Sequence, residues 1–156
     1  MIAGAHYTHT NLIARDWRTL ASFYESVFGC AIVPPERDYS GPPIAALSGI
    51  PGAALRGAHL RLPGAGDPGP TLEIFEYTVV EPGPMPAINR PGFGHIAFAV
   101  DSVVDARDEV LSAGGSAVGE VVRLTTATGA VVTACYVTDP EGNIIELQSW
   151  DSSASS

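Results

Sequence analysis

The chain has 156 residues, a net charge of −9 and 46% hydrophobic residues, which suits one folded domain and excludes wholesale disorder. All 8 basic residues are Arg, so chemistry that depends on Lys is excluded. The charge argues against a nucleic-acid partner, because no basic stripe is present to neutralise phosphates.

Two further observations bear on location and redox state. No apolar run reaches the roughly 20 residues that a membrane-spanning helix needs, and residues 1–6 do not resemble a secretory signal. We therefore expect a cytoplasmic protein without a membrane partner. Cys30 and Cys135 form neither a disulfide framework nor a metal-binding spacing, and we expect both to be reduced and semi-buried.

The first elements in chain order are a strand and an amphipathic helix. Residues 8–14 are typical of a strand, and apolar side chains recur with helical spacing from Trp17 to Phe28. Asp16 suits the N-cap of this helix, and Gly29 suits its C-terminal stop.

Two more strands are expected in the first half, at about 53–62 and 71–77. The segment 34–51 is loop-like, with room for one short strand near 44–47. Residues 81–91 are rich in Pro and Gly and are predicted to be a linker.

The second half starts with a similar strand and helix. Residues 94–100 predict the strand, and Asp101 or Ser102 then caps a helix that ends at 114–115. The strands that follow are predicted at 117–124, 131–138 and 143–150. The sequence Asp-Pro-Glu-Gly-Asn at 139–143 predicts a tight turn that joins the last two as a hairpin.

The two halves therefore repeat one pattern, a strand, a helix and about three strands. Neither half is long enough to bury its own sheet face, so we expect one domain over 1–152 with modules at 6–80 and 92–150. The linker is 81–91, and residues 151–156 are expected to be a disordered tail.

Each half offers one His in its opening strand and one Glu in its closing strand. They are His9 and Glu73 in the first half, and His95 and Glu146 in the second. Two imidazoles and two carboxylates suit a first-row divalent cation, namely Ni, Co, Zn, Mn or Fe. A pseudo-twofold packing would bring all four residues to one ion and leave positions open for water or substrate.

Nearby polar residues are less suited to this site. Glu76 lies three positions after Glu73, so the two point to opposite faces of a regular strand. His6 and His59 have no counterpart in the other half, and we interpret them as structural or surface groups.

These residues resemble the vicinal oxygen chelate superfamily, which includes glyoxalase I, methylmalonyl-CoA epimerase, extradiol dioxygenases, and fosfomycin- and bleomycin-resistance proteins. The segments that carry the resemblance are His9, Asp16, Phe23-Tyr24, 72–74, 94–98 and 139–147. The likeness extends from His6 to Trp150. It implies an α+β fold of paired βαβββ modules that form a cupped, incomplete barrel around the metal. It also implies a homodimer, and in glyoxalase I the site is shared between subunits.

Within the superfamily, the order His, Glu, His, Glu is that of glyoxalase I. The epimerase usually has Gln in second place, and extradiol dioxygenases and fosfomycin-modifying enzymes use only His, His and Glu. The resemblance therefore implies a metal-dependent lyase or isomerase that acts on a small substrate with adjacent oxygens through a metal-stabilised enediolate. Glu146 is the first choice for the catalytic base and Glu73 the second.

Two other functions remain open at this point. One is a metal-dependent dioxygenase or an epoxide-opening resistance enzyme, which oxygen uptake with iron or thiol addition to an epoxide would reveal. The other is a non-catalytic protein that sequesters a drug or metabolite, which tight ligand binding without turnover or metal would reveal.

Overall fold

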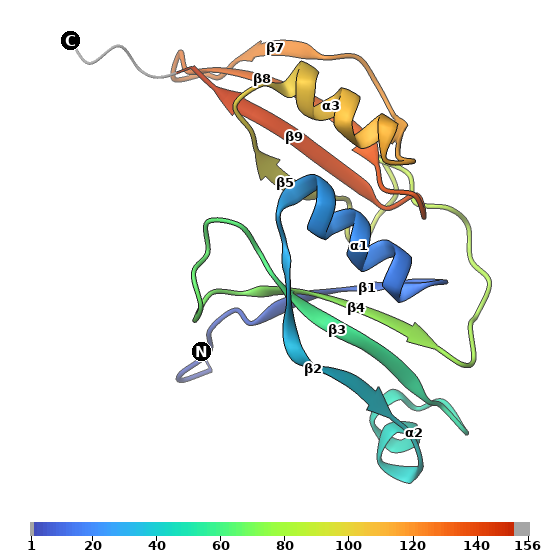
Figure 1. The fold of residues 1–156 in the computed structure, drawn as a ribbon. Helices are drawn as coiled ribbons and strands as arrows, with labels where there is room; N and C mark the ends of the chain where they lie inside the picture. Colours follow the sequence, from blue (N-terminus) through green and yellow to red (C-terminus); the bar gives the residue numbers. More distant parts are fainter. Residues whose placement is uncertain (1, 152–156) are drawn as a thin grey trace. The chain divides into compact units, whose positions relative to one another are not determined.

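The computed structural model describes residues 2–151, and it divides into two compact units, Met1–Pro82 and Gly83–Ser156. Within the described residues there are three helices and two sheets, and neither sheet closes into a barrel (Figure 1). This mixed architecture confirms the expected fold class. The predicted tail at 151–156 lies outside the described residues except for Asp151. No helix within 2–151 has the length and apolar character needed to cross a membrane.

The first unit is built on a four-stranded sheet with the strand order β1-β4-β3-β2. Strand β1 pairs in parallel with β4, whereas β3 is antiparallel to both of its neighbours. The elements in chain order are β1 (His9–Ile13), α1 (Trp17–Phe28), β2 (Ala31–Tyr39), α2 (Pro42–Ser48), β3 (Leu55–Arg61) and β4 (Thr71–Tyr77).

Helix α1 has the predicted bounds because local signals define both of its ends. The Asp16 side chain accepts hydrogen bonds from the backbone N–H groups of Arg18 and Thr19 at 3.1 and 3.2 Å. Gly29 ends the helix with φ 68°, a left-handed conformation that costs little without a Cβ atom. The buried side chains of α1, which pack on β2, β3 and β4, are Trp17, Leu20, Ala21, Phe23 and Tyr24.

The prediction of a loop over 34–51 is wrong, because β2 continues to Tyr39. Strand β2 lies at the edge of the sheet, and its register with β3 shifts between Val33 and Arg37. The two prolines of β2 fall inside this irregularity, where a missing N–H breaks no ladder hydrogen bond. Proline therefore marks a bulged edge strand here rather than a loop.

The short strand predicted near 44–47 is instead part of helix α2. The helix begins with prolines at its first positions, where no intrahelical N–H partner is needed, and Gly49 ends it with φ 72°. None of its residues is buried. The helix is therefore not selected by an apolar stripe, so hydrophobic periodicity could not reveal it.

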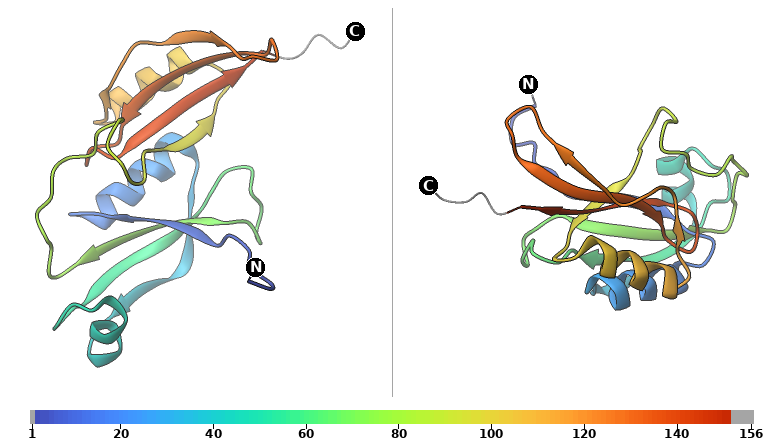
Figure 2. Two further views of the ribbon diagram at one scale, coloured as in Figure 1. Left: turned by 180° about the vertical axis from the view of Figure 1, so that it is seen from behind. Right: turned by 90° about the horizontal axis from the view of Figure 1, so that it is seen from above.

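The second unit contains a five-stranded sheet with the order β5-β9-β8-β6, in which β7 also pairs with β8. Strand β5 is parallel to β9, which matches the β1–β4 pair of the first unit. Helix α3 packs on β8 and β9 (Figure 2). The elements are β5 (Ile96–Ala99), α3 (Val103–Ser112), β6 (Ser116–Ala117), β7 (Val122–Thr125), β8 (Val131–Thr138) and β9 (Ile144–Trp150).

The single strand predicted at 117–124 is divided into β6 and β7. Both pair with β8, but the step from Ala117 to Val122 covers more residues than the opposing step from Val137 to Ala134. The surplus residues leave the ladder, as in a bulge. All residues of β6 and β7 are exposed, so no buried face enforces one continuous register.

The predicted turn between the last two strands is confirmed, and a buried aspartate organises it. Asp139 is 1% exposed. Its carboxylate accepts hydrogen bonds from the backbone N–H groups of Glu141 and Asn143 at 2.9 and 3.0 Å, and from the Asn143 amide at 2.8 Å. These donors offset the cost of burying the charge, so the hairpin is specified locally.

Candidate metal centre

The parallel strand pairs place each predicted His beside its predicted Glu. In the first unit Asn11 is opposite Glu73, so His9 lies one same-face step away, and its Nε2 is 3.5 Å from Glu73 Oε2. In the second unit Ala97 is opposite Glu146, and His95 Nε2 lies 2.9 Å from Glu146 Oε2. Each unit thus joins its own histidine and glutamate at the same offset.

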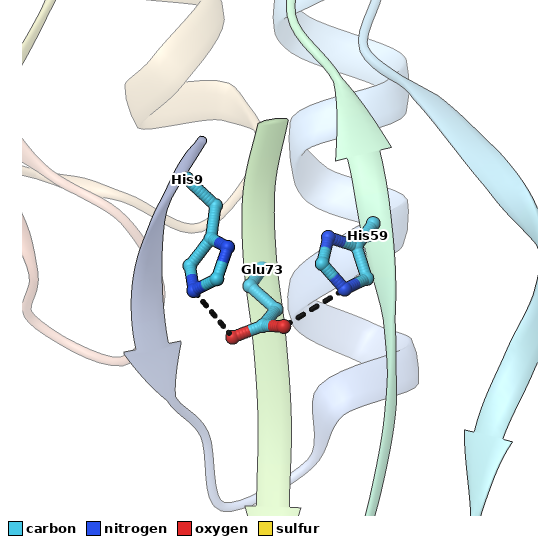
Figure 3. Close-up of side chains that lie close together, drawn as sticks. All are labelled: His9, His59 and Glu73. Atoms are coloured by element: carbon cyan, nitrogen blue, oxygen red, sulfur yellow. Dashed lines mark ion pairs between the residues drawn. The ribbon is translucent and has the colours of Figure 1, made fainter. Parts of the chain in front are cut away.

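Glu73 lies at the centre of a larger cluster in the first unit. It is 9% exposed, and its Oε1 lies 2.8 Å from Nε2 of His59 on the neighbouring strand β3. The Asn11 amide donates a hydrogen bond to Glu73 Oε2 at 3.0 Å. Figure 3 shows His9, Glu73 and His59 on adjacent strands, on the sheet face opposite α1. One potential ligand atom from each of these three residues lies within 4.8 Å of the other two.

Both imidazoles of this cluster are oriented in the same way. His59 Nδ1 lies 2.9 Å from the Thr71 hydroxyl, and His9 Nδ1 lies 3.3 Å from the Thr8 hydroxyl. Each ring therefore presents its Nε2 to Glu73 while a threonine holds the other nitrogen. Metal-ligating histidines are oriented by such a second hydrogen bond.

The surroundings of His59 favour its neutral form. Burial lowers the pKa of His59, the Glu73 carboxylate opposes this shift, and the nearby Arg37 and His9 add to the lowering. A neutral imidazole has the free lone pair that metal binding requires.

Sequence reasoning left His59 out of the site. The β3–β4 register pairs His59 with Glu73, but a loop of nine residues separates the two strands and hides this pairing in the sequence. The comparison of the halves also missed it, because the residue opposite Glu146 is Tyr136. His6, the other histidine left out, is exposed, and its Nδ1 lies 3.3 Å from the carbonyl oxygen of Gly4.

The pair in the second unit has a simpler environment. The His95 ring lies 5.1 Å from the Tyr136 ring, and the Glu146 side chain is 22% exposed, twice the 11% of Glu73. No second imidazole contacts Glu146 within the described part of the chain. This carboxylate is therefore less constrained than Glu73.

Glu76 has partners of its own. Its Oε1 lies 2.8 Å from Arg56 Nη2, and its Oε2 accepts a hydrogen bond from the Trp17 N–H at 3.4 Å. A carboxylate at the start of a helix is favoured by the helix dipole. Glu76 thus links β4 to the first residue of α1 rather than facing the metal site.

The donors around Glu73 fit a divalent cation. Imidazole nitrogen and carboxylate oxygen are ligands that first-row divalent metals accept. The ion pairs of Glu73 in residues 2–151 are with imidazoles rather than with a guanidinium. A cation would compensate the charge of the buried carboxylate, which a neutral His59 imidazole does not do.

The sequence of this chain matches a known protein superfamily. The sequence profile of the Glyoxalase/Bleomycin resistance protein/Dioxygenase superfamily matches residues 6–147. The chain belongs to this superfamily. The match covers both units and confirms the family resemblance seen in the sequence. No curated protein sequence matches the chain significantly.

Solved structures of superfamily proteins have the same fold. A glyoxalase family protein from Bacillus cereus is 17% identical with a TM-score of 0.75, and the alignment covers 97% of each chain. A glyoxalase I variant from Zea mays is 17% identical with a TM-score of 0.60, over 91% of this chain and 45% of that one. A fosfomycin resistance protein from Listeria monocytogenes is 16% identical with a TM-score of 0.56, over 97% and 96%. At these identities the likeness shows the fold alone.

Proposed function

We propose that this protein is a metal-dependent lyase or isomerase of the glyoxalase I type, acting on a small substrate with two adjacent oxygens. The observation that carries the proposal is the duplicated His–Glu pair. In both units the histidine lies at the same offset from a glutamate on a parallel strand pair, at 3.5 and 2.9 Å. A protein that only sequesters a ligand has no need of these donors at equivalent positions.

In this proposal His9, Glu73, His95 and Glu146 hold one divalent ion, which is Ni, Co, Zn, Mn or Fe. The bound ion supplies Lewis-acid stabilisation of the negative charge that develops beside a carbonyl. The four residues supply two imidazoles and two carboxylates, a donor set suited to such an ion.

Glu146 is the residue proposed to remove the proton next to the substrate carbonyl, with Glu73 as the second candidate. A general base must reach the proton that it takes. The Glu146 side chain is twice as exposed as that of Glu73, which is held by His9, His59 and Asn11. The less constrained carboxylate is better suited to move.

We further propose that the protein is a homodimer, as implied by its resemblance to glyoxalase I. Sedimentation equilibrium of the full chain tests this directly. A mass of two chains would support the proposal, and a monomer at micromolar concentration would contradict it.

The first experiment measures metal per chain by elemental analysis after reloading with Ni, Co, Zn, Mn and Fe(II) in turn. The proposal expects about one ion per chain. The loaded protein is then incubated in deuterated water with a panel of α-hydroxyketones and thiol adducts of 2-oxoaldehydes. Exchange of the hydrogen beside the carbonyl, followed by NMR, reports the proposed step. Oxygen uptake by the Fe(II) form without any exchange would indicate the dioxygenase alternative instead.

A further inference from the structure

His9, His59 and Glu73 all belong to the first unit, and their side chains meet without any contribution from the second unit. We propose that the first unit carries a cation site of its own, in which His9, His59 and Glu73 all bind the same first-row divalent metal ion. His59 is thereby a metal ligand rather than a structural side chain. Two imidazoles with one carboxylate are a donor set that such ions, including Fe(II), accept with positions left open.

The donor atoms of the three residues converge. His59 Nε2 lies 2.8 Å from one oxygen of Glu73, and His9 Nε2 lies 3.5 Å from the other. The three strands that carry these residues are adjacent, since β4 lies between β1 and β3. Their register therefore defines the cluster, and all three ligand residues lie on strands rather than in loops.

Polar side chains contact each of the three donor groups. The hydroxyls of Thr71 and Thr8 lie near Nδ1 of His59 and His9, and each can accept a hydrogen bond once the ring carries its proton on Nδ1. That tautomer leaves Nε2 free to bind a cation. Asn11 holds the carboxylate through a bond of 3.0 Å. Ligands with this kind of support are characteristic of metal sites.

At equivalent positions, the second unit has neither the additional imidazole nor the carboxamide beside its glutamate. The positions equivalent to His59 and Asn11 there are Tyr136 and Ala97. A structural requirement of the fold at these positions would be met by an aromatic ring and a methyl group, as it is in the second unit. The additional imidazole and carboxamide beside Glu73 thus need an explanation beyond folding, and cation binding provides one.

This inference goes beyond the proposed function, because it requires neither residues of the second unit nor any catalytic activity. It shares His9 and Glu73 with that proposal, so the experiment has to separate the two. The informative substitutions are His59→Phe, which keeps a ring where the second unit has Tyr136, and the pair His95→Ala with Glu146→Ala. His6→Ala is the matched control, since His6 lies outside the cluster.

The test titrates the metal-free full chain with Co(II) by calorimetry and counts imidazole nitrogens by pulsed EPR of the Cu(II) form. Because the proposed function also makes His95 and Glu146 ligands, we expect H95A/E146A to bind the ion more weakly than the native chain. The variant should nevertheless keep one ion with two imidazole nitrogens, those of His9 and His59. Adding H59F should then weaken binding by more than the roughly 10–100-fold that an outer partner of a ligand contributes. In the otherwise native chain H59F should lower the nitrogen count by one, and H6A should change nothing. H59A should give the same loss of a nitrogen ligand, which would show that the effect of H59F does not come from the larger Phe ring. Thermal unfolding of both variants checks that they are folded.

Three outcomes separate the two proposals. If H59F keeps native affinity and nitrogen count, the inference is overturned while the four-residue site can stand. If H59F loses a nitrogen ligand but no substrate shows proton exchange, the inference holds and the proposed function fails. If the native chain binds no divalent ion, both are overturned.

Discussion

In the first unit Glu73 lies against two imidazoles and a carboxamide, whereas in the second unit Glu146 lies against one imidazole beside a tyrosine ring. The backbone plan is the same, because a parallel strand pair sets the offset between His and Glu in both. The difference arises from His59 and Tyr136, which face the two carboxylates from the adjacent antiparallel strand. Backbone register thus decides where side chains meet, and residue type decides what they can do there.

This contrast indicates a division of roles between the two glutamates. Glu73 is the more buried and has three side-chain partners, which suits a ligand that stays in place. Glu146 is the more exposed, which suits a group that moves a proton.

The largest changes in proton-exchange rate and metal affinity are expected when Glu146 and Glu73 are replaced in turn by Gln. E146Q should lower the rate of proton exchange by roughly 10²–10⁴-fold, because a carboxamide cannot act as a general base. E73Q should mainly weaken Co(II) affinity. Exchange rates by NMR and titrations by calorimetry distinguish the two. Full activity in E146Q, with unchanged thermal unfolding, would contradict the assignment of Glu146 as base.

Introducing a second imidazole beside Glu146 should give the second unit a stronger metal site, as in the first unit. In a chain whose first unit carries H9A and H59F, adding Y136H places an imidazole opposite Glu146 and beside His95. Co(II) affinity should rise by about 10-fold or more, since a second nitrogen ligand joins the pair. Calorimetric titration measures the change, and Y136F is the control. An equal affinity for Y136H and Y136F would show that this position does not govern metal binding.

A smaller change is expected from the amide that holds Glu73. N11A removes the hydrogen bond to Oε2, and metal affinity should fall by roughly 10-fold, as for an outer partner of a ligand. The converse substitution A97N, at the equivalent position of the second unit, introduces the same donor opposite Glu146. Measuring the Co(II) affinity of both variants shows whether an amide at this position strengthens metal binding in each unit. An unchanged affinity in N11A would mean that Asn11 does not position the carboxylate.

The smallest effect concerns the two buried cysteines, one in each unit. Both are free, as predicted, and both are buried. Burial raises the pKa of Cys30 to about 11, with the charge of Glu25 adding to the shift. Burial also raises the pKa of Cys135, but Arg107 opposes it. We expect neither thiol to react with iodoacetamide at pH 8 in the folded protein, and Cys135 to react before Cys30 as the pH rises.

The raised pKa of Cys30 also makes the stability of the fold depend on pH. The folded state favours the protonated Cys30 thiol, so its contribution is fully present below pH 9, the ordinary pKa, and is lost as the pH rises toward about 11. Urea unfolding of the native chain between pH 8 and 11 should therefore show a decline that is smaller in C30A. A parallel decline in both would rule out Cys30 as its source.

The sequence alone determined the elements whose signals are local. Helix α1 begins after Asp16 and ends before Gly29, because a side-chain cap and a left-handed glycine act within one turn of the helix. Strands β4 and β8 also have their predicted bounds, and the turn at 139–143 carries its own hydrogen bonds. The repeat predicted the His–Glu pairs, since both halves preserve the same residue types at the same places.

Only the tertiary structure decided the features that depend on neighbours distant in sequence. Strand β2 contains prolines because an edge position with a register shift tolerates them, which no local signal states. Strands β6 and β7 separate because their pairing with β8 is interrupted and no buried face unites them. His59 joins Glu73 through the register of a hairpin closed by a long loop, and such cross-strand contacts are set by pairing rather than by the identity of the residues themselves.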